Sequence, residues 1–161
     1  MIRLFLIFSL ATLTFASCKL KEQNVLVLDQ EHILTSIEIN KLDSLYKDHE
    51  KKTSNEIALI TTVKYVPDTS ILSYATELGN KYGVGKDGRN NGVVILVSTA
   101  KQQVAIATGK GTEKVLKDEI AQKIIDSFMI TKFRQGKNFE AIWDGSIEVI
   151  KFLELPRNKI K

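Results

Sequence analysis

The side chains that most often carry catalysis or bind zinc are scarce in this chain of 161 residues. Its two histidines, His32 and His49, are far apart, and no His-x-x-x-His or His/Cys pattern with the spacing of zinc ligands occurs. No Gly-x-Ser-x-Gly nucleophile elbow occurs. The single cysteine, Cys18, excludes an internal disulfide and a Cys-based zinc cluster. Nucleophilic schemes based on serine, histidine or cysteine therefore have no obvious set of residues.

Oxygen-bearing side chains are the more informative group. They stand at the ends of the expected strands and in the loops that follow: Asp29, Asp87, Asn90, Asn91, Glu113 and Asp118. Loops at the same end of a sheet can converge, and a hard cation such as calcium takes six to eight oxygen ligands. Three separated acidic loops could supply such ligands, so a site for a hard cation, Ca²⁺ or Mg²⁺, is one hypothesis, although the residues taken singly favour structural roles. Each residue also has a structural interpretation, with Asp29 and Asp118 as helix caps and Asn91 as part of a turn.

A second feature is the turn Gly109-Lys110-Gly111-Thr112, which follows an expected strand and precedes an expected helix. Such a turn resembles a phosphate-binding loop, but the Walker pattern is absent. We favour the interpretation that the glycines supply positive φ in a strand-to-helix turn.

Hydrophobic periodicity predicts the elements that position these loops. Thr35-x-x-Glu38 is a capping box at the start of a helix. The continuous apolar run 93–97 is typical of a central strand that is covered on both faces. The full prediction is a short lead-in strand at 25–28, helices at 35–53, 70–82, from 118 and 138–153, and strands at 56–64, 93–97 and 102–108. This order predicts an α/β fold, a small central β-sheet sandwiched between helices in three layers.

The amino terminus predicts export. Residues 1–17 have one basic residue, Arg3, then an apolar stretch too short to span a membrane comfortably, and then small residues. Phe15-Ala16-Ser17-Cys18 resembles a bacterial lipobox, which implies lipidation of Cys18. The predicted organisation is a signal peptide (1–17), a lipid-anchored tether (18–24), one domain (25–155) and a tail (156–161). The protein is therefore expected on the periplasmic side of the cell envelope or on the cell surface.

Composition excludes several other classes. Hydrophobic residues make up 43% and charged residues 26%, which is typical of a globular chain and not of a disordered or polytopic membrane protein. The net charge is +4, with basic residues spread among acidic ones, so no nucleic-acid partner is indicated.

Taken in order, several of these segments resemble the TPM-domain family. The residues that carry the resemblance are 27–29 with 33–35, 53–58, 82–85, 90–97, 109–113, 116–118 and 133–139. The family fold is a small sheet between helices. Some of its members are described as calcium- or magnesium-binding and as acid phosphatases, and others as maintenance or interaction modules of membrane complexes.

The resemblance implies an acidic pocket built from Asp29, Asn90, Asn91, Glu113 and Asp118. The family usually has Asp-Asn-Gly where this chain has Asn90-Asn91-Gly92, so one anionic ligand is lost and affinity for a dication should fall. The basic residue that often follows the central strand is replaced by Gln102 or displaced to Lys101.

Two hypotheses follow. In one, the protein is a metal-dependent acid phosphatase of low specificity, in which Lys110 or Arg134 meets the phosphate. In the other, it is a lipid-anchored binding module that serves an envelope membrane protein, with a weak divalent-cation site and no chemistry. The missing nucleophile and the amide at Asn90 favour the binding module.

Overall fold

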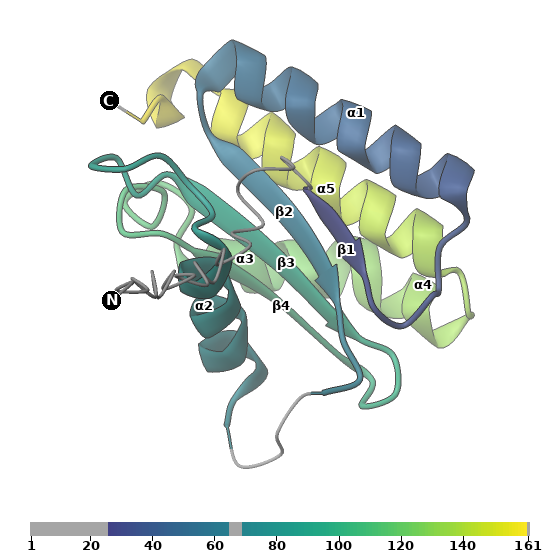
Figure 1. Ribbon diagram of the computed structural model, residues 1–161. Helices are drawn as coiled ribbons and strands as arrows, with labels where there is room; N and C mark the ends of the chain where they lie inside the picture. The colour runs from purple at the N-terminus through teal and green to yellow at the C-terminus, as the bar shows by residue number, and fades with distance from the viewer. Residues whose placement is uncertain (1–25, 65–68, 161) are drawn as a thin grey trace, which may run out of the picture.

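The computed structural model describes residues 26–64 and 69–160, and a four-stranded sheet lies at its centre. The strands are adjacent in chain order: β1 (Val27–Asp29), β2 (Glu56–Thr61), β3 (Gly92–Ser98) and β4 (Gln103–Thr108). The first three are parallel, and β4 returns antiparallel to β3 (Figure 1). One end of the sheet therefore holds the carboxyl ends of β1, β2 and β3. The opposite end holds the start of β3 and the end of β4.

Helices cover both faces of this sheet, which confirms the predicted three-layer α/β fold. On one face lie α1 (Ser36–Thr53), α5 (Asn138–Glu154) and a helical stretch over 118–134; α2 (Ile71–Tyr82) covers the other (Figure 1). Every residue of β3 is buried, as its apolar run predicts. Successive side chains of β3 point to the two helical layers in turn, with Ile95 in the larger core and Leu96 in the smaller one. A single 3₁₀ turn (Pro156–Asn158) follows α5.

Helix α1 begins where its sequence pattern places it. The Thr35 side chain accepts a hydrogen bond from the Glu38 N–H, and the Glu38 carboxylate accepts one from the Thr35 N–H at 2.7 Å. Both bonds satisfy donors that the first turn of a helix leaves free. The capping box is confirmed.

The helical stretch over 118–134 differs in detail from its prediction. It consists of α3 (Asp118–Ile124), a π-helical segment (Ile125–Met129) and α4 (Ile130–Arg134). Asp118 does not cap α3: Lys117 occupies the cap position without a side-chain hydrogen bond, and Asp118 lies in the first turn. A carboxylate in the first turn is favoured by the helix dipole.

Two polar contacts join α1 to α5, one of them fully buried. The hydroxyl of Tyr46 lies 2.7 Å from that of Ser146, and burial raises the pKa of Tyr46 well above its usual value. One turn further along α1, Nδ1 of His49 lies 3.0 Å from Oε1 of Glu154. No helix in the described residues has both the length and the hydropathy needed to cross a membrane.

We expect His49 to make stability depend on pH. Burial lowers the pKa of His49, and the nearby Lys52 charge adds to this, while Glu154 opposes it in part. Below the ordinary histidine pKa of about 6.5 the unfolded chain therefore binds a proton that the folded chain resists, so the free energy of unfolding falls as pH falls.

For one proton, the free energy of unfolding changes by at most about 1.4 kcal/mol per pH unit. Urea unfolding at pH 7.5 and 5.5, followed by the fluorescence of the single tryptophan, Trp143, measures it. His49→Gln should reduce the difference in the free energy of unfolding between pH 7.5 and 5.5. His32→Gln, at an exposed position, is the matched control. An unchanged difference in His49→Gln would show that other groups cause the pH dependence.

Candidate functional site

Asp29 lies at the carboxyl end of β1, and its carboxylate holds the following loop. Its Oδ1 accepts a hydrogen bond from the Thr61 hydroxyl at 2.5 Å and another from the Ile33 N–H at 3.3 Å. Its Oδ2 accepts one from the Leu34 N–H at 2.9 Å. Both carboxylate oxygens are thus engaged in bonds that fix the chain between β1 and α1 to the end of β2.

Glu31 performs a similar role that the sequence analysis missed. Its Oε2 accepts hydrogen bonds from the backbone N–H of Thr99 at 2.9 Å and from the Thr99 hydroxyl at 2.5 Å. The loop after β1 is thereby tied to the turn between β3 and β4. No local pattern signals this contact, because Glu31 and Thr99 are far apart in sequence.

Asn91 is a structural residue at the opposite end of the sheet. Its side chain is buried, with Oδ1 accepting from the Lys86 N–H at 2.8 Å. Its Nδ2 donates to the carbonyl of Ser54 at 2.7 Å and to Oδ1 of Asn55 at 3.1 Å. The amide therefore joins the loop 83–92 to the end of α1, and its oxygen is already engaged by a backbone donor.

The turn 109–112 packs its backbone against the loop that holds Asn90. The Gly111 N–H donates to the Asn90 carbonyl at 2.9 Å, and a Cβ at Gly111 would lie 2.0 Å from the carbonyl oxygen of Arg89. Neither Gly109 nor Gly111 has positive φ, so that explanation for them was wrong. Glycine is needed because two backbones meet there. The hydroxyl of Thr112 is buried, with no hydrogen-bond partner in the described chain.

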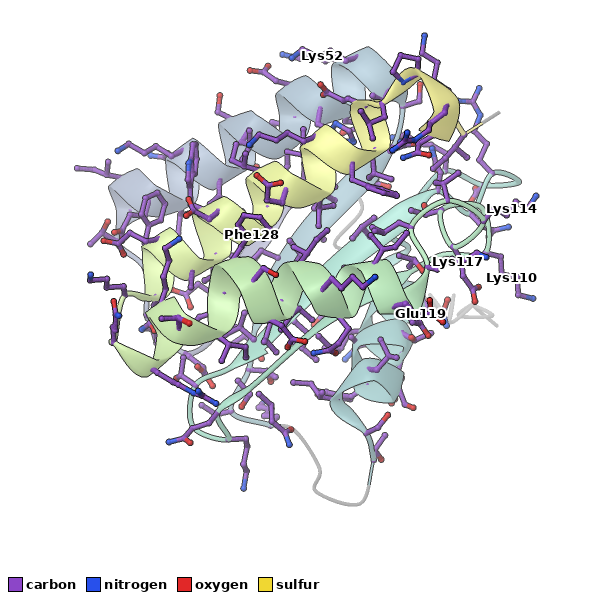
Figure 2. The ribbon with its side chains drawn as sticks, turned by 180° about the vertical axis from the view of Figure 1, so that it is seen from behind. Lys52, Lys110, Lys114, Lys117, Glu119 and Phe128 are labelled. Carbon is purple, nitrogen blue, oxygen red and sulfur yellow. The ribbon has the colours of Figure 1, made fainter. Side chains whose placement is uncertain are left out.

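The remaining candidates on this side are exposed. Asn90, Lys110, Glu113 and Asp118 lie on the surface, on the two loops and at the start of α3. Lys110, Lys114 and Lys117 gather at this end of the molecule, with Glu119 close by (Figure 2).

The structure does not bring the five predicted cation ligands together. Asp29 lies at the carboxyl end of the parallel strands, and Asn90, Asn91 and Glu113 lie beyond the other end of β3. A strand of seven residues separates these ends by about 20 Å. Within 26–64 and 69–160, no group of three or more His, Cys, Asp or Glu side chains is placed to hold a metal ion. These residues do not fit one cation centre, and we derive no catalytic step through one.

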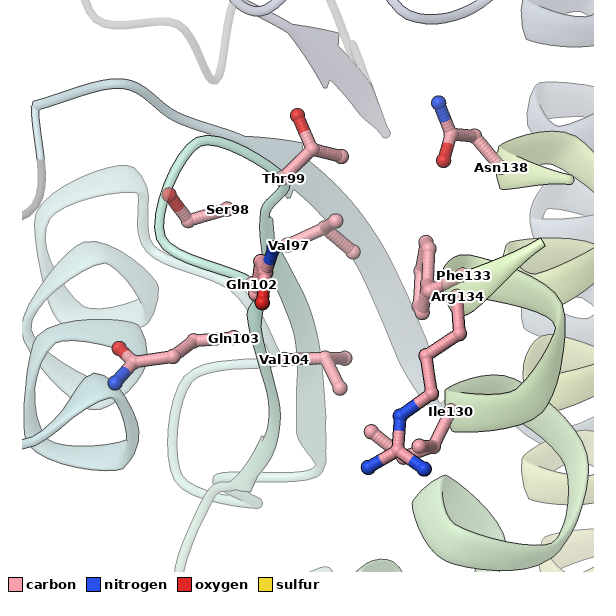
Figure 3. Close-up of a pocket in the computed structure, with 10 residues that line it drawn as sticks. All are labelled: Val97, Ser98, Thr99, Gln102, Gln103, Val104, Ile130, Phe133, Arg134 and Asn138. Atoms are coloured by element: carbon pink, nitrogen blue, oxygen red, sulfur yellow. The ribbon is translucent and has the colours of Figure 1, made fainter. Parts of the chain in front are cut away.

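Arg134 lies with Asp29 at the carboxyl end of the strands, where it borders a pocket of about 370 Å³ (Figure 3). The pocket separates the β3–β4 turn from α4 and the start of α5. Ten residues line it: Val97, Ser98, Thr99, Gln102, Gln103, Val104, Ile130, Phe133, Arg134 and Asn138. Arg134 is the only charged residue among them. Lys110, the other candidate for meeting a phosphate, is at the opposite end of the sheet.

A family model described as "TPM domain" matches residues 27–152. Among curated proteins, chloroplastic UPF0603 proteins of Oryza sativa subsp. indica and subsp. japonica are each 25% identical over 122 residues. That alignment covers 75% of this chain and 40% of each relative. The chain thus spans less than half the length of these relatives.

Two solved structures are similar in fold. The solution structure of the N-terminal domain of a protein from P. gingivalis has a TM-score of 0.75 and 25% identity, covering 84% of this chain and 86% of that one. The BA42 protein from the psychrophilic bacterium Bizionia argentinensis has a TM-score of 0.64 and 23% identity, covering 82% of this chain and 97% of that one.

Proposed function

The chain belongs to the TPM domain family, and from this premise we propose that it is a binding module of the bacterial cell envelope, held to a membrane by lipid on Cys18, that performs no catalysis. Its partner would be an envelope membrane protein. A divalent cation would bind weakly, through the exposed oxygens of Asn90, Glu113 and Asp118. The competing proposal is an acid phosphatase of low specificity.

The engagement of the acidic and amide side chains is the observation that supports a binding module. A metal-dependent phosphatase needs carboxylates that are free to hold the metal ion. These carboxylates must also lie beside the basic side chain that binds the phosphate. Here both oxygens of Asp29 accept hydrogen bonds from the protein, and the oxygen of Asn91 does the same. Lys110 and Arg134 lie at opposite ends of the sheet, so one phosphate cannot meet both.

A phosphatase assay on the full-length chain, purified in a non-ionic detergent, separates the two proposals. We expect no release of phosphate from a generic phosphomonoester above the level of a Glu113→Ala and Asp118→Ala double variant. Turnover that this double variant loses would contradict the binding module and support the phosphatase. Turnover that it keeps would not arise at the proposed cation site and would be traced by repurification.

Replacing Cys18 should abolish lipid attachment. When the chain is produced in a bacterium fed labelled palmitate, the unchanged chain should incorporate label and lose residues 1–17, and Cys18→Ser should do neither. Several acyl chains give a stable anchor where one is marginal, so the unchanged chain should also resist extraction by high salt.

The matched control is Ser17→Ala, which keeps the cysteine and a small residue before it. Mass spectrometry of the amino-terminal peptide identifies the modification directly. An unlabelled wild-type chain, or label retained by Cys18→Ser, would contradict the lipoprotein proposal without bearing on the domain itself.

A further inference from the structure

The pocket beside Arg134 has features of a ligand site that the proposed function does not yet use. It lies where β3 ends and the antiparallel β4 begins. Its volume of about 370 Å³ is at the small end of the range for small-molecule sites. Figure 3 shows its two walls, with the β3–β4 turn on one side and α4 with the start of α5 on the other.

The charge of the pocket comes from one side chain. Within the described residues the side chain of Arg134 has no ion pair or hydrogen bond, whereas that of Lys132, two positions away, is paired with Asp144. None of the ten lining residues is acidic. A guanidinium offers two parallel N–H donors that match a carboxylate or a phosphate. The pocket therefore favours an anion.

Neutral donors and apolar surface complete the lining. Gln102, in the β3–β4 turn, and Asn138, the first residue of α5, offer side-chain amides. Val104, Ile130 and Phe133 are only partly buried and leave apolar surface open to the pocket. A ligand with an anionic group at one end and a small apolar body at the other would satisfy both kinds of surface.

We propose that this pocket binds a small organic anion, with its carboxylate or phosphate group on Arg134 and its apolar body against Val104, Ile130 and Phe133. The proposal names a ligand class for the proposed binding module. It rests on the proposed function in one respect, that the ligand is bound and not chemically converted. Lipid attachment at Cys18 plays no part in it.

Isothermal titration of the full-length chain in non-ionic detergent tests the proposal with matched probes. Benzoate and phenyl phosphate carry the two anionic groups, and benzamide is the neutral counterpart of benzoate. We expect at least one of the two anions to bind at least about tenfold more tightly than benzamide, because a hydrogen bond to a charged group is strong. Which of them binds more tightly distinguishes a carboxylate ligand from a phosphate ligand.

Variants then locate the site. Arg134→Gln should weaken binding of the preferred anion at least about tenfold, and Arg134→Lys less, because lysine keeps the charge but loses the two-pronged geometry. Arg157→Gln removes another exposed arginine and should change nothing. Val104→Phe keeps the guanidinium and fills the pocket, so it should also abolish binding. Trp143 fluorescence confirms that each variant is folded.

Three results would overturn the proposal: no binding of either anion at 10 mM, equal affinity for benzamide, or full affinity in either Arg134→Gln or Val104→Phe. Inorganic phosphate that binds as tightly as phenyl phosphate would refute the apolar half of the site. Release of phosphate from phenyl phosphate would instead refute the non-catalytic function and leave the binding site standing, so the two failures are distinguishable.

Discussion

Gly92→Ala is expected to lower the free energy of unfolding by about 3 kcal/mol or more. Gly92 is the buried first residue of β3, and an added Cβ would lie 2.3 Å from the carbonyl oxygen of Val84 and 3.0 Å from the amide nitrogen of Gly85. Those are backbone atoms, which cannot rotate away as a side chain can. Either β3 or the loop 83–92 must shift.

The loop has little freedom to shift, because three contacts hold it. The Gly85 N–H donates to Oε2 of Glu56 at 2.6 Å, and the Lys86 ammonium is paired with Glu50. The Asn91 amide supplies the third contact. A change at Gly92 therefore strains these contacts, and also the hydrogen bond at 2.9 Å from the Gly109 N–H to the Gly92 carbonyl, which anchors the turn 109–112.

Gly88→Ala is the matched control for Gly92→Ala. Gly88 lies in the same loop with φ of +77° and nothing within 4 Å of its would-be Cβ, so alanine there costs only backbone strain, about 1 kcal/mol. Urea midpoints from Trp143 fluorescence and far-ultraviolet circular dichroism measure both variants. Equal losses of stability in the two variants would show that the close backbone approach at Gly92 does not make alanine more costly there than at Gly88.

Local patterns predicted the elements because their causes are local. Thr35 and Glu38 cap α1 within one turn, and the unbroken apolar run before Ser98 is sufficient for a strand covered on both faces. The three-layer arrangement follows from these elements and their order. The π-helical segment at 125–129 had no local signal, since the buried Ile125 and Met129 also suit a regular helix.

The candidate site was harder to predict because it depends on partners that are distant in sequence. An aspartate after a strand has the same local pattern whether it binds a cation or holds a loop, and the Thr61 hydroxyl decides between these roles for Asp29. Gly111 likewise suits a turn with positive φ until the Arg89 carbonyl is placed beside it. Arg134 was named, with Lys110, as a residue that could meet a phosphate, but the pocket that Arg134 borders requires β3 and β4 to be in place.

Asp29→Ala is expected to lower the free energy of unfolding by about 2–4 kcal/mol, because it leaves the Ile33 and Leu34 N–H groups and the Thr61 hydroxyl without their acceptor. Asp29→Asn keeps one acceptor oxygen and should cost less. Glu113→Ala, at an exposed carboxylate outside any described hydrogen bond, should change the free energy by less than about 0.5 kcal/mol. Urea unfolding of the three variants gives this ranking.

The same variants distinguish a loop-holding aspartate from a cation ligand. A ligand of the native state raises the unfolding midpoint in proportion to its occupancy, so millimolar calcium should raise the midpoint of the unchanged chain by only a degree or two if its affinity is weak. Calcium should raise the unfolding midpoint of Asp29→Asn as much as that of the unchanged chain, because both oxygens of Asp29 accept hydrogen bonds from the protein. In Glu113→Ala the rise in the midpoint should be smaller. A shift that disappears in Asp29→Asn and survives in Glu113→Ala would place the cation at the carboxyl end of β1 and would contradict the proposed site at Asn90, Glu113 and Asp118.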